Sequence, residues 1–328
     1  MDSIIQVENL TRDYQSFRAV DNISFSVNPG TTFGFLGPNG AGKTTTIKML
    51  CTLLRPTSGS ATVAGYNVLT DPMKVRQSLG IIFQDPTLDD RLTAYENLKF
   101  HGILYGWHGP NLEKQIGEML ELVSLSDKKD DFVRTFSGGM KRRLELARGL
   151  IHTPKILFLD EPTIGLDPQT RVHLWDYFAR LKKEREITLF LTTHYMEEAE
   201  NCDKIAIMDH GKIVAMDTPS RLKSQLQGTL IFLKTEDDVK TKEFLKQRYQ
   251  LTAEDDEGGI VFEVNAPEKW LPNFLKDSPI PVVKLNLQRP SLEDVFIHLT
   301  GREIRDEEGT WLSSARALMR KNRHGGRR

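Results

Sequence analysis

A short glycine-rich segment near the N-terminus has the composition and spacing of a phosphate-binding loop. It reads Gly37-Pro38-Asn39-Gly40-Ala41-Gly42-Lys43-Thr44-Thr45. Its glycines allow successive backbone N–H groups to face phosphate oxygens, and a helix that begins at its end adds a positive N-terminal pole. Lys43 is expected to reach the β- and γ-phosphates, and the Thr44 hydroxyl to bind Mg²⁺. The segment therefore predicts a nucleotide-binding site.

Two adjacent carboxylates, Asp160 and Glu161, follow the apolar run 156–159. A strand that ends in a carboxylate beside a phosphate loop can hold Mg²⁺, directly or through water. Glu161 follows immediately and is placed to polarise an attacking water molecule. Apolar runs often end in Asp-Glu, but here the pair comes about 115 residues after a phosphate loop, the arrangement of a nucleotide hydrolase.

A third segment, Ser137-Gly138-Gly139, begins a second helical pattern. The apolar positions of that pattern are Leu144, Ala147, Leu150 and Ile151. A helix that starts with small residues is suited to bind an anion. The economical interpretation is that this second anion site serves the nucleotide of another copy of the chain. An ordinary serine N-cap explains the same residues, and both interpretations remain open.

A parallel sheet is the element that can bring these segments together. Short apolar runs typical of strands occur at 5–8, 23–27, 32–36, 61–64, 79–83, 156–159, 187–191, 205–208 and 212–215. Apolar runs separated by helices favour a parallel sheet covered on both faces, and so an α/β fold. From about 87 to 152 the pattern is helical and charged, which predicts an inserted helical subdomain.

We expect a domain boundary near residue 217. Residues 218–308 alternate between strand and helix patterns and predict a small α+β accessory domain, which carries no chemical constellation and suits binding or dimerisation. The segment 309–328 is basic, with apolar residues at helical spacing. It predicts either an amphipathic helix for an anionic membrane or a partner, or a solvated, disordered tail.

The bulk composition excludes several classes of protein. The 328 residues are 39% hydrophobic and 27% charged with a net charge of −1, so no overall basic charge argues for nucleic acid. Cys51 and Cys202 are too far apart in sequence to suggest a disulfide framework, which fits a reducing cytosol. The first residues lack the form of a signal peptide, and no apolar run approaches the ~18–20 residues that cross a bilayer. Any membrane-spanning part of the function is therefore expected from another chain.

The combined motifs resemble a known family. They occur in the order Gly37–Thr45, Gln84, Ser137-Gly138-Gly139, Asp160-Glu161, Gly165-Leu166-Asp167 and His194. Over about residues 1–217 this order and spacing resemble the nucleotide-binding subunit of an ABC transporter. The resemblance implies a P-loop NTPase fold, with a RecA-like core, an ABC β-subdomain and the inserted helical subdomain. It also implies an ATPase that uses ATP and Mg²⁺.

The resemblance assigns roles to residues that carry no signal by themselves. Tyr14 would stack on the adenine ring, although a packed surface aromatic is the simpler alternative. Gln84 would sense Mg²⁺ and the attacking water. His194 would hydrogen-bond the γ-phosphate, although a histidine at a strand end is otherwise more often structural.

Other roles implied by the resemblance involve two copies of the chain. Asp167 would link the two sites across a homodimer. Ser137 and Gly139 would bind the γ-phosphate held by the other copy. The usual signature is Leu-Ser-Gly-Gly-Gln, whereas Phe136 and Met140 flank the segment here. The phosphate-binding core is kept, but a glutamine-mediated contact at position 140 is not expected.

A narrower resemblance concerns the branch of the family. Residues 136–148 together with 290–302 are similar to the daunorubicin-resistance-type exporter ATPases, which carry a C-terminal accessory domain and pair with a separate permease. We therefore expect an export ATPase at the cytoplasmic face of the membrane, whose permease docks between the Gln84 segment and the helical subdomain. The cargo, a drug, a lipid or another substrate, does not follow. A soluble ABC-type ATPase acting on DNA or ribosomes and a non-hydrolysing scaffold are the alternatives.

Overall fold

The computed structural model describes most of the chain. The described residues are 3–84, 87–164, 166–226, 228–256 and 258–301. The chain divides into two units, Met1–Pro219 and Ser220–Arg328. Gly165, the predicted tail 309–328 and the end of the predicted accessory domain lie outside the described residues.

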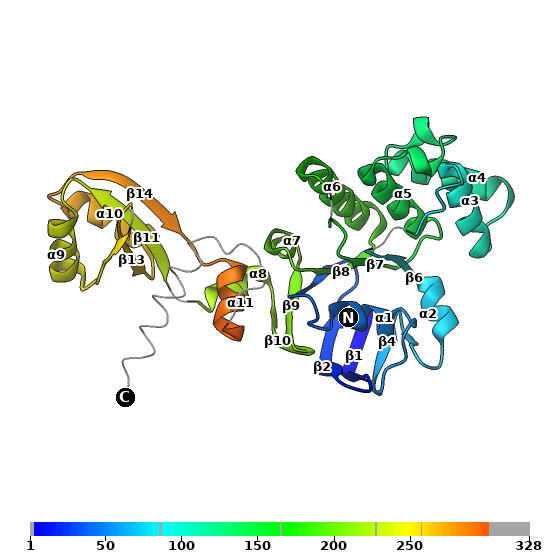
Figure 1. Ribbon diagram of the computed structural model, residues 1–328, viewed down its shortest axis with the longest axis horizontal. Coiled ribbons are helices and arrows are strands. Elements are labelled where there is room, and N and C mark those ends of the chain that lie inside the picture. Colours follow the sequence, from blue (N-terminus) through cyan, green and yellow to red (C-terminus); the bar gives the residue numbers. More distant parts are fainter. Residues whose placement is uncertain (1–2, 85–86, 165, 227, 257, 302–328) are drawn as a thin grey trace. The chain divides into compact units, whose positions relative to one another are not determined.

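A six-stranded sheet forms the centre of the first unit (Figure 1). In sheet order its strands are β10 (Lys212–Asp217), β9 (Lys204–Asp209), β3 (Thr32–Leu36), β8 (Thr188–Thr193), β7 (Ile156–Asp160) and β6 (Leu79–Ile82). Strand β10 pairs antiparallel with β9, whereas the other pairings are parallel. Strands β3, β7 and β8 are buried at every position, as continuous apolar runs in a covered parallel sheet should be. The predicted α/β fold is confirmed.

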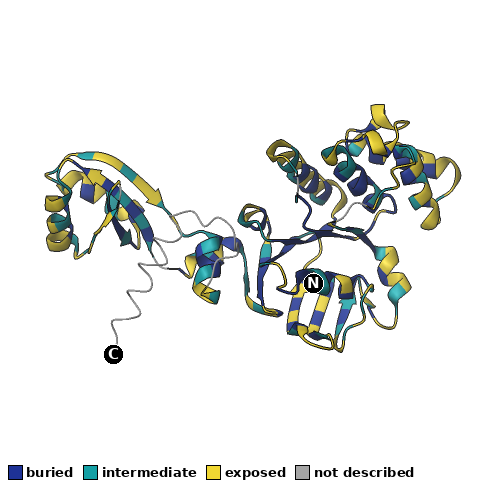
Figure 2. Ribbon diagram, viewed as in Figure 1, coloured by how far each residue is buried: buried dark blue, intermediate teal, exposed yellow. Residues whose placement is uncertain are grey.

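Phenylalanine side chains pack together beneath the ends of the central strands. Phe33 and Phe35 of β3 and Phe190 of β8 meet Phe25 from the neighbouring sheet, and Phe158 of β7 packs on Phe190, with ring centroids 5.0 to 6.1 Å apart in the contacting pairs. All five are buried, and the central strands are dark blue in Figure 2. Each ring contributes about 2–3 kcal/mol of burial, so the strand ends that carry the polar residues rest on a rigid base.

An antiparallel sheet packs beside the central one. Its order is β2 (Arg18–Val27), β1 (Ile5–Asp13), β4 (Ser58–Val63) and β5 (Tyr66–Asn67). Helix α1 (Lys43–Leu50) contacts β2, β4 and β7 and so lies between the two sheets. Helix α2 (Pro72–Ser78) leads from the antiparallel sheet into β6.

Helices cover the remaining face of the central sheet, and the first three of them form the inserted subdomain. They are α3 (Ala94–Leu104), α4 (Gly109–Leu122), α5 (Gly138–Leu150), α6 (Pro168–Arg185) and α7 (Met196–Glu200), with 3₁₀ turns at Ser126–Lys128 and Val133–Thr135. Helix α3 starts with a capping box, in which Thr93 and Glu96 bond each other's backbone N–H groups. Within the described residues of 87–152, β pairing is limited to one bridge between Thr93 and Phe132.

The second unit is a small α+β structure. It contains α8 (Pro219–Ser224, which spans the division), β11 (Thr229–Thr235), α9 (Asp238–Tyr249), β12 (Glu254–Asp256), β13 (Gly259–Val264), α10 (Pro267–Asp277), β14 (Val282–Gln288) and α11 (Leu292–Thr300). Its antiparallel sheet has the order β12-β13-β11-β14. Phe274 of α10 and Leu245 of α9 pack with Ile231, Leu233 and Phe262 of the sheet in one core.

A cluster of two histidines and a tyrosine joins the ends of α3 and α5. Tyr105 stacks on His152, with ring centroids 3.8 Å apart, and His152 Nε2 lies 2.8 Å from the Leu79 carbonyl oxygen. His101 lies beside this pair. Burial, together with the charge of Arg148 and the neighbouring His152, lowers the pKa of His101 from 6.5 to about 4.

This pKa predicts acid sensitivity. In the unfolded chain His101 binds a proton near pH 6.5, whereas in the folded chain it does so only near pH 4, so the free energy of unfolding falls as pH is lowered through this window. We expect a loss on the order of 2 kcal/mol. His152 should contribute to the loss of stability in acid in the same direction, because burial lowers its pKa. Chemical denaturation at several pH values should show a smaller acid loss for His101→Gln than for the parent; equal losses would contradict the assignment.

Candidate nucleotide-binding site

The predicted phosphate loop joins β3 to α1 in a conformation that its glycines make possible. Gly42 caps α1 with a φ of +103°, and a Cβ atom there would lie 2.6 Å from the Ala19 carbonyl oxygen. A Cβ on Gly37 would lie 2.3 Å from the Met208 carbonyl oxygen. Larger residues at these two positions would push the loop away from the sheet. Between them, Asn39 and Gly40 are exposed at the tip of the loop.

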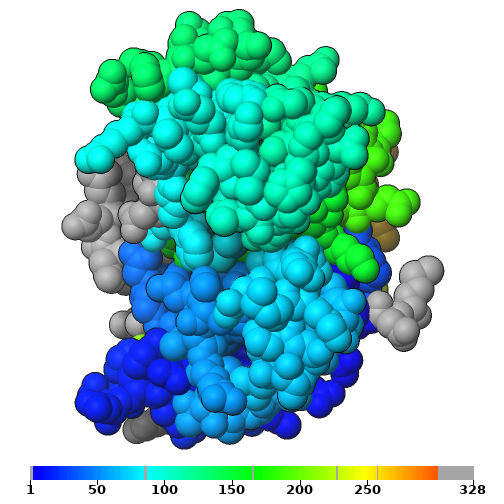
Figure 3. Space-filling model, turned by 90° about the vertical axis from the view of Figure 1, so that its right-hand side faces the viewer, coloured from blue at the N-terminus to red at the C-terminus, as the bar shows by residue number. Residues whose placement is uncertain are grey.

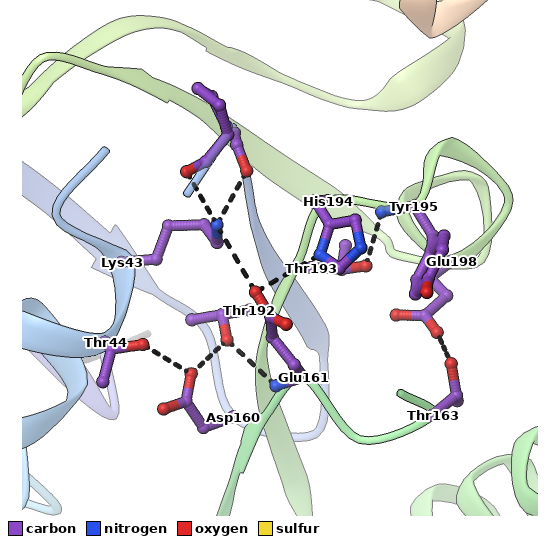
Figure 4. Close-up of polar contacts among 12 residues, drawn as sticks. Lys43, Thr44, Asp160, Glu161, Thr163, Thr192, Thr193, His194, Tyr195 and Glu198 are labelled. Carbon is purple, nitrogen blue, oxygen red and sulfur yellow. Dashed lines mark hydrogen bonds and ion pairs between the residues drawn. The ribbon is translucent and has the colours of Figure 1, made fainter. Parts of the chain in front are cut away.

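Lys43 is buried inside the loop (Figure 4). Its Nζ atom donates to the carbonyl oxygens of Gly37 at 2.7 Å and Pro38 at 3.0 Å, and it lies 3.7 Å from Glu161 Oε1. Burial lowers the pKa of Lys43, while Glu161 and Asp160 oppose that shift. The ammonium group is therefore held at the centre of the loop by acceptors that incoming phosphate oxygens can replace.

Thr44 and Asp160 meet as the sequence predicts. Thr44 Oγ1 donates to Asp160 Oδ1 at 3.0 Å, and Thr192 Oγ1 of β8 donates to the same oxygen at 2.5 Å. Mg²⁺ prefers oxygen ligands and takes few from the protein when phosphates and waters supply the rest, so a hydroxyl facing a carboxylate fits it. Among the described residues, no group of three or more His, Cys, Asp or Glu residues is arranged to hold a metal ion.

Glu161 is held in an unusual backbone conformation. Its φ is +49°, a region that costs a non-glycine residue energy, and its N–H group bonds Thr192 Oγ1 at 3.1 Å and the Thr192 carbonyl at 3.2 Å. Its Oε1 lies 3.3 Å from His194 Nδ1 and close to Lys43. Burial opposes ionisation, but His194 and Lys43 more than offset it and keep the pKa of Glu161 below its usual value. The result is a carboxylate that is ionised at neutral pH.

Further residues that the sequence did not single out support this arrangement. Thr163 donates to the buried carboxyl group of Glu198 on α7. Burial raises the pKa of Glu198. Since Thr163 follows Glu161 closely and Glu198 follows His194, this contact joins the two loops that carry the catalytic candidates. Thr192 lies two residues before His194, and no local pattern in the sequence marks it.

Two further predicted residues are accessible to solvent. Tyr14 is 39% exposed, stacks on Phe17 with ring centroids 5.3 Å apart, and carries the Arg12 guanidinium 4.8 Å from its ring centre. Gln84 follows β6 and is exposed. Tyr14 and Gln84 are thus both open to solvent, and the Tyr14 ring already carries Phe17 and Arg12 as neighbours.

The serine-glycine segment lies at the start of α5. Ser137 is the N-cap, and its hydroxyl accepts from Met140 N at 3.2 Å. Ser137 and Gly138 are exposed. Asp167 caps α6 and accepts from Thr170 through both its backbone N–H, at 3.0 Å, and its hydroxyl, at 2.6 Å. These bonds lower the pKa of Asp167.

Thr170 also brings two of the predicted segments together. A Cβ atom on Gly139 would lie 3.0 Å from Thr170 Cγ2, so the start of α5 packs against the Thr170–Asp167 cap. Among the described residues, the Ser137 hydroxyl bonds Met140 N and forms no hydrogen bond to Lys43, Asp160 or Glu161. The chain thus has two separate regions that are suited to bind an anion, the phosphate loop and the start of α5.

Comparison with known proteins identifies the family. The family profile described as "ABC transporter" matches residues 20–164. The linearmycin resistance ATP-binding protein LnrL of Bacillus subtilis is 39% identical, over 92% of this chain and 100% of that protein. The chain belongs to the ATP-binding subunits of ABC transporters. The resemblance expected from the sequence is confirmed, and the protein is an ATP-binding, ATP-hydrolysing subunit of this family.

Other similarities refine the branch of this ABC ATPase. The profile described as "ATP-binding protein DrrA1-3-like, C-terminal domain" matches residues 218–300. The daunorubicin/doxorubicin resistance ATP-binding protein DrrA of Streptomyces peucetius is 36% identical over 92% of this chain and 94% of its own length. The Nod factor export ATP-binding protein I of Ralstonia nicotianae is 37% identical over 92% and 95%.

A solved structure supports the fold and the reaction. A dimeric ATP-binding cassette in a post-hydrolysis state, bound to ADP and Pi, superposes with a TM-score of 0.60 and 26% sequence identity. The match covers 65% of this chain and 98% of that one. In the described part of the present chain, no helix has the length and hydropathy needed to span a bilayer.

Proposed function

We propose that the ABC ATPase drives export through a separate permease, with two copies closing around two ATP molecules. In each site Lys43, Asp160 and Glu161 of one copy act with Ser137 and Gly139 of the other. The observation that carries this proposal is the contact of Lys43 and His194 with Glu161, beside the Thr44–Asp160 pair.

The residues of the site divide the chemical work. Lys43 and the loop N–H groups neutralise and orient the phosphates. Glu161 accepts a proton from the attacking water, and His194 holds the carboxylate and the γ-phosphate in line. Mg²⁺, with Thr44, Asp160 and Gln84 as its candidate ligands, would supply charge neutralisation on the phosphates. Tyr14 offers its ring to the adenine.

The second copy completes the site in this proposal. Ser137 and Gly138 are exposed at a helix N-terminus, and in the described part of the chain Ser137 forms no hydrogen bond to the phosphate loop of its own copy. Asp167, exposed beside Gly139 through Thr170, would contact the opposite chain at the same seam. Closure would exclude water, and hydrolysis would reopen the pair.

The proposed docking face for the permease carries large exposed apolar side chains. Figure 3 views the side of the molecule on which α2, α3 and α4 lie. Phe100 and Leu104 on α3 are 61% and 64% exposed, and Met73 on α2 is 63% exposed. Large apolar side chains exposed on one side of a molecule mark interaction sites. This face suits a permease segment at the cytoplasmic surface of the membrane, and the relatives named for drug resistance and Nod factor export favour an exporter of drug-like or lipid-like cargo.

Co-purification from solubilised membranes tests this proposal. We expect the tagged full chain to bring down an integral membrane protein. Leu104→Asp should reduce its recovery at least about tenfold, because it places a charge where the complex would bury an apolar side chain. ATP turnover of the isolated chain should be unchanged. Val239→Asp, at a position 67% exposed on α9, is the matched control. Recovery of ribosomes or DNA instead would favour a soluble ABC-type ATPase.

A further inference from the structure

A buried ion pair lies one turn into α5, next to the Ser137-Gly138-Gly139 segment. Arg142 Nη1 lies 3.0 Å from Glu145 Oε2, and the two residues are 8% and 1% exposed. Buried charges are tolerated only when they are paired and their remaining donors and acceptors are satisfied. The partners of this pair are therefore informative.

Arg142 binds the backbone of two segments that carry catalytic candidates. Its Nη1 donates to the carbonyl oxygen of Phe83 at 2.6 Å, immediately before Gln84. Its Nε donates to the carbonyl of Pro162 at 2.8 Å, and its Nη2 makes a longer contact of 3.4 Å with the carbonyl of Glu161. The planar guanidinium fork fixes the angles between these acceptors, which a flexible ammonium group would not do.

Glu145 holds the other side of the Gln84 segment. Its Oε1 accepts from the backbone N–H of Thr87 at 2.8 Å. Arg148, one turn further along α5, donates to the Thr87 carbonyl at 2.9 Å. The Gln84 segment is thus attached to α5 at Phe83 and at Thr87.

We infer that Arg142 and Glu145 are positioning residues that fix α5 to both the Gln84 segment and the Glu161 backbone. The inference rests on the two-chain site proposed above, in which the start of α5 contacts the partner's nucleotide. A displacement of α5 on that contact is transmitted through one side-chain pair to both segments of its own site. Binding in one site and water activation in the other are coupled by this route.

The decisive variant removes both charges together, because either single removal leaves an unpaired buried charge that can prevent folding. For Arg142→Met/Glu145→Leu in the full chain, we expect a thermal midpoint near that of the parent and an ATP dissociation constant within about threefold of it. The maximal turnover should fall at least about tenfold, since catalytic geometry and not ground-state binding is lost.

Two further variants separate positioning from simple stabilisation. Arg142→Lys keeps the positive charge but not the guanidinium fork, so the variant should fold and bind ATP but turn ATP over slowly. If Arg142→Lys turned over ATP at the parent's rate, the position would need only a positive charge for stability. Lys141→Gln removes a neighbouring α5 charge, whose 2.8 Å ion pair with Asp90 touches neither segment, and should keep turnover within about twofold.

The outcomes distinguish this inference from the proposed function. If the double variant turns over ATP at the parent's rate, or fails to fold, the positioning role is overturned. If Glu161→Gln hydrolyses ATP as fast as the parent, the proposed site itself is wrong. If the double variant binds ATP but turns it over slowly, and Glu161→Gln does not hydrolyse ATP, the results support both the positioning role and the proposed site.

Discussion

Glu161→Gln lowers ATP turnover by about 10²–10⁴-fold while ATP binding is retained, because the amide cannot accept the proton of the attacking water. The loss corresponds to about 3–5 kcal/mol in the activation barrier. The substitution is nearly isosteric, and the bonds of the Glu161 N–H group to Thr192 do not depend on the side chain. Single-turnover hydrolysis and equilibrium binding, measured side by side, separate the two effects.

The pH dependence gives this prediction a second readout. Because the pKa of Glu161 is held below its usual value, turnover in the parent should be flat near neutrality and fall only in acid, as the carboxylate is protonated. Glu184→Gln, an exposed change on α6, is the matched control and should behave as the parent. Equal turnover in the parent and in Glu161→Gln would contradict the role given to Glu161.

Lys43→Met lowers ATP affinity by about 10²-fold or more and abolishes measurable turnover. The ammonium group is the buried cation of the phosphate loop, and charge-assisted bonds to phosphate contribute about 1.5–3 kcal/mol each. Methionine has a similar length and shape, so the loop should keep its packing. Calorimetric titration with ATP measures the loss directly.

The stability of the same variant provides the control. Burial lowers the pKa of Lys43, which means that its charge is costly in the ATP-free fold. The thermal midpoint of Lys43→Met without nucleotide should therefore equal or exceed that of the parent, whereas the stabilisation that ATP gives the parent should disappear. A variant that unfolds readily without nucleotide, or that still binds ATP at the parent's affinity, would contradict the role given to Lys43.

The sequence was sufficient to predict those features whose signal lies within one short segment. The phosphate loop is one contiguous segment whose glycines and lysine act through neighbouring backbone, so its position between β3 and α1 was predictable. The buried strands were equally readable, because a covered parallel sheet needs continuous apolar runs. Short elements such as α2, α7 and β12 were missed, because five to seven residues, or three in β12, carry too little periodicity.

The sequence was insufficient where a role depends on tertiary contacts. Thr192 lies 32 positions from Asp160 in the chain yet donates to its carboxylate, and nothing in the local pattern marks it. Arg142 and Glu145 read as ordinary charges on a helix surface until the fold buries them against the Phe83 and Thr87 backbone. The role of Ser137 depends on a second chain, so the pattern within one chain left it open between a partner's nucleotide and an ordinary N-cap.

The central claim, that ATP is bound between two copies of this chain, is tested most directly by sedimentation velocity of full-length Glu161→Gln. With saturating ATP and Mg²⁺ the account predicts a dimer, and without nucleotide a monomer at the same concentration. A species that stays monomeric with ATP, even alongside its membrane partner, would contradict it.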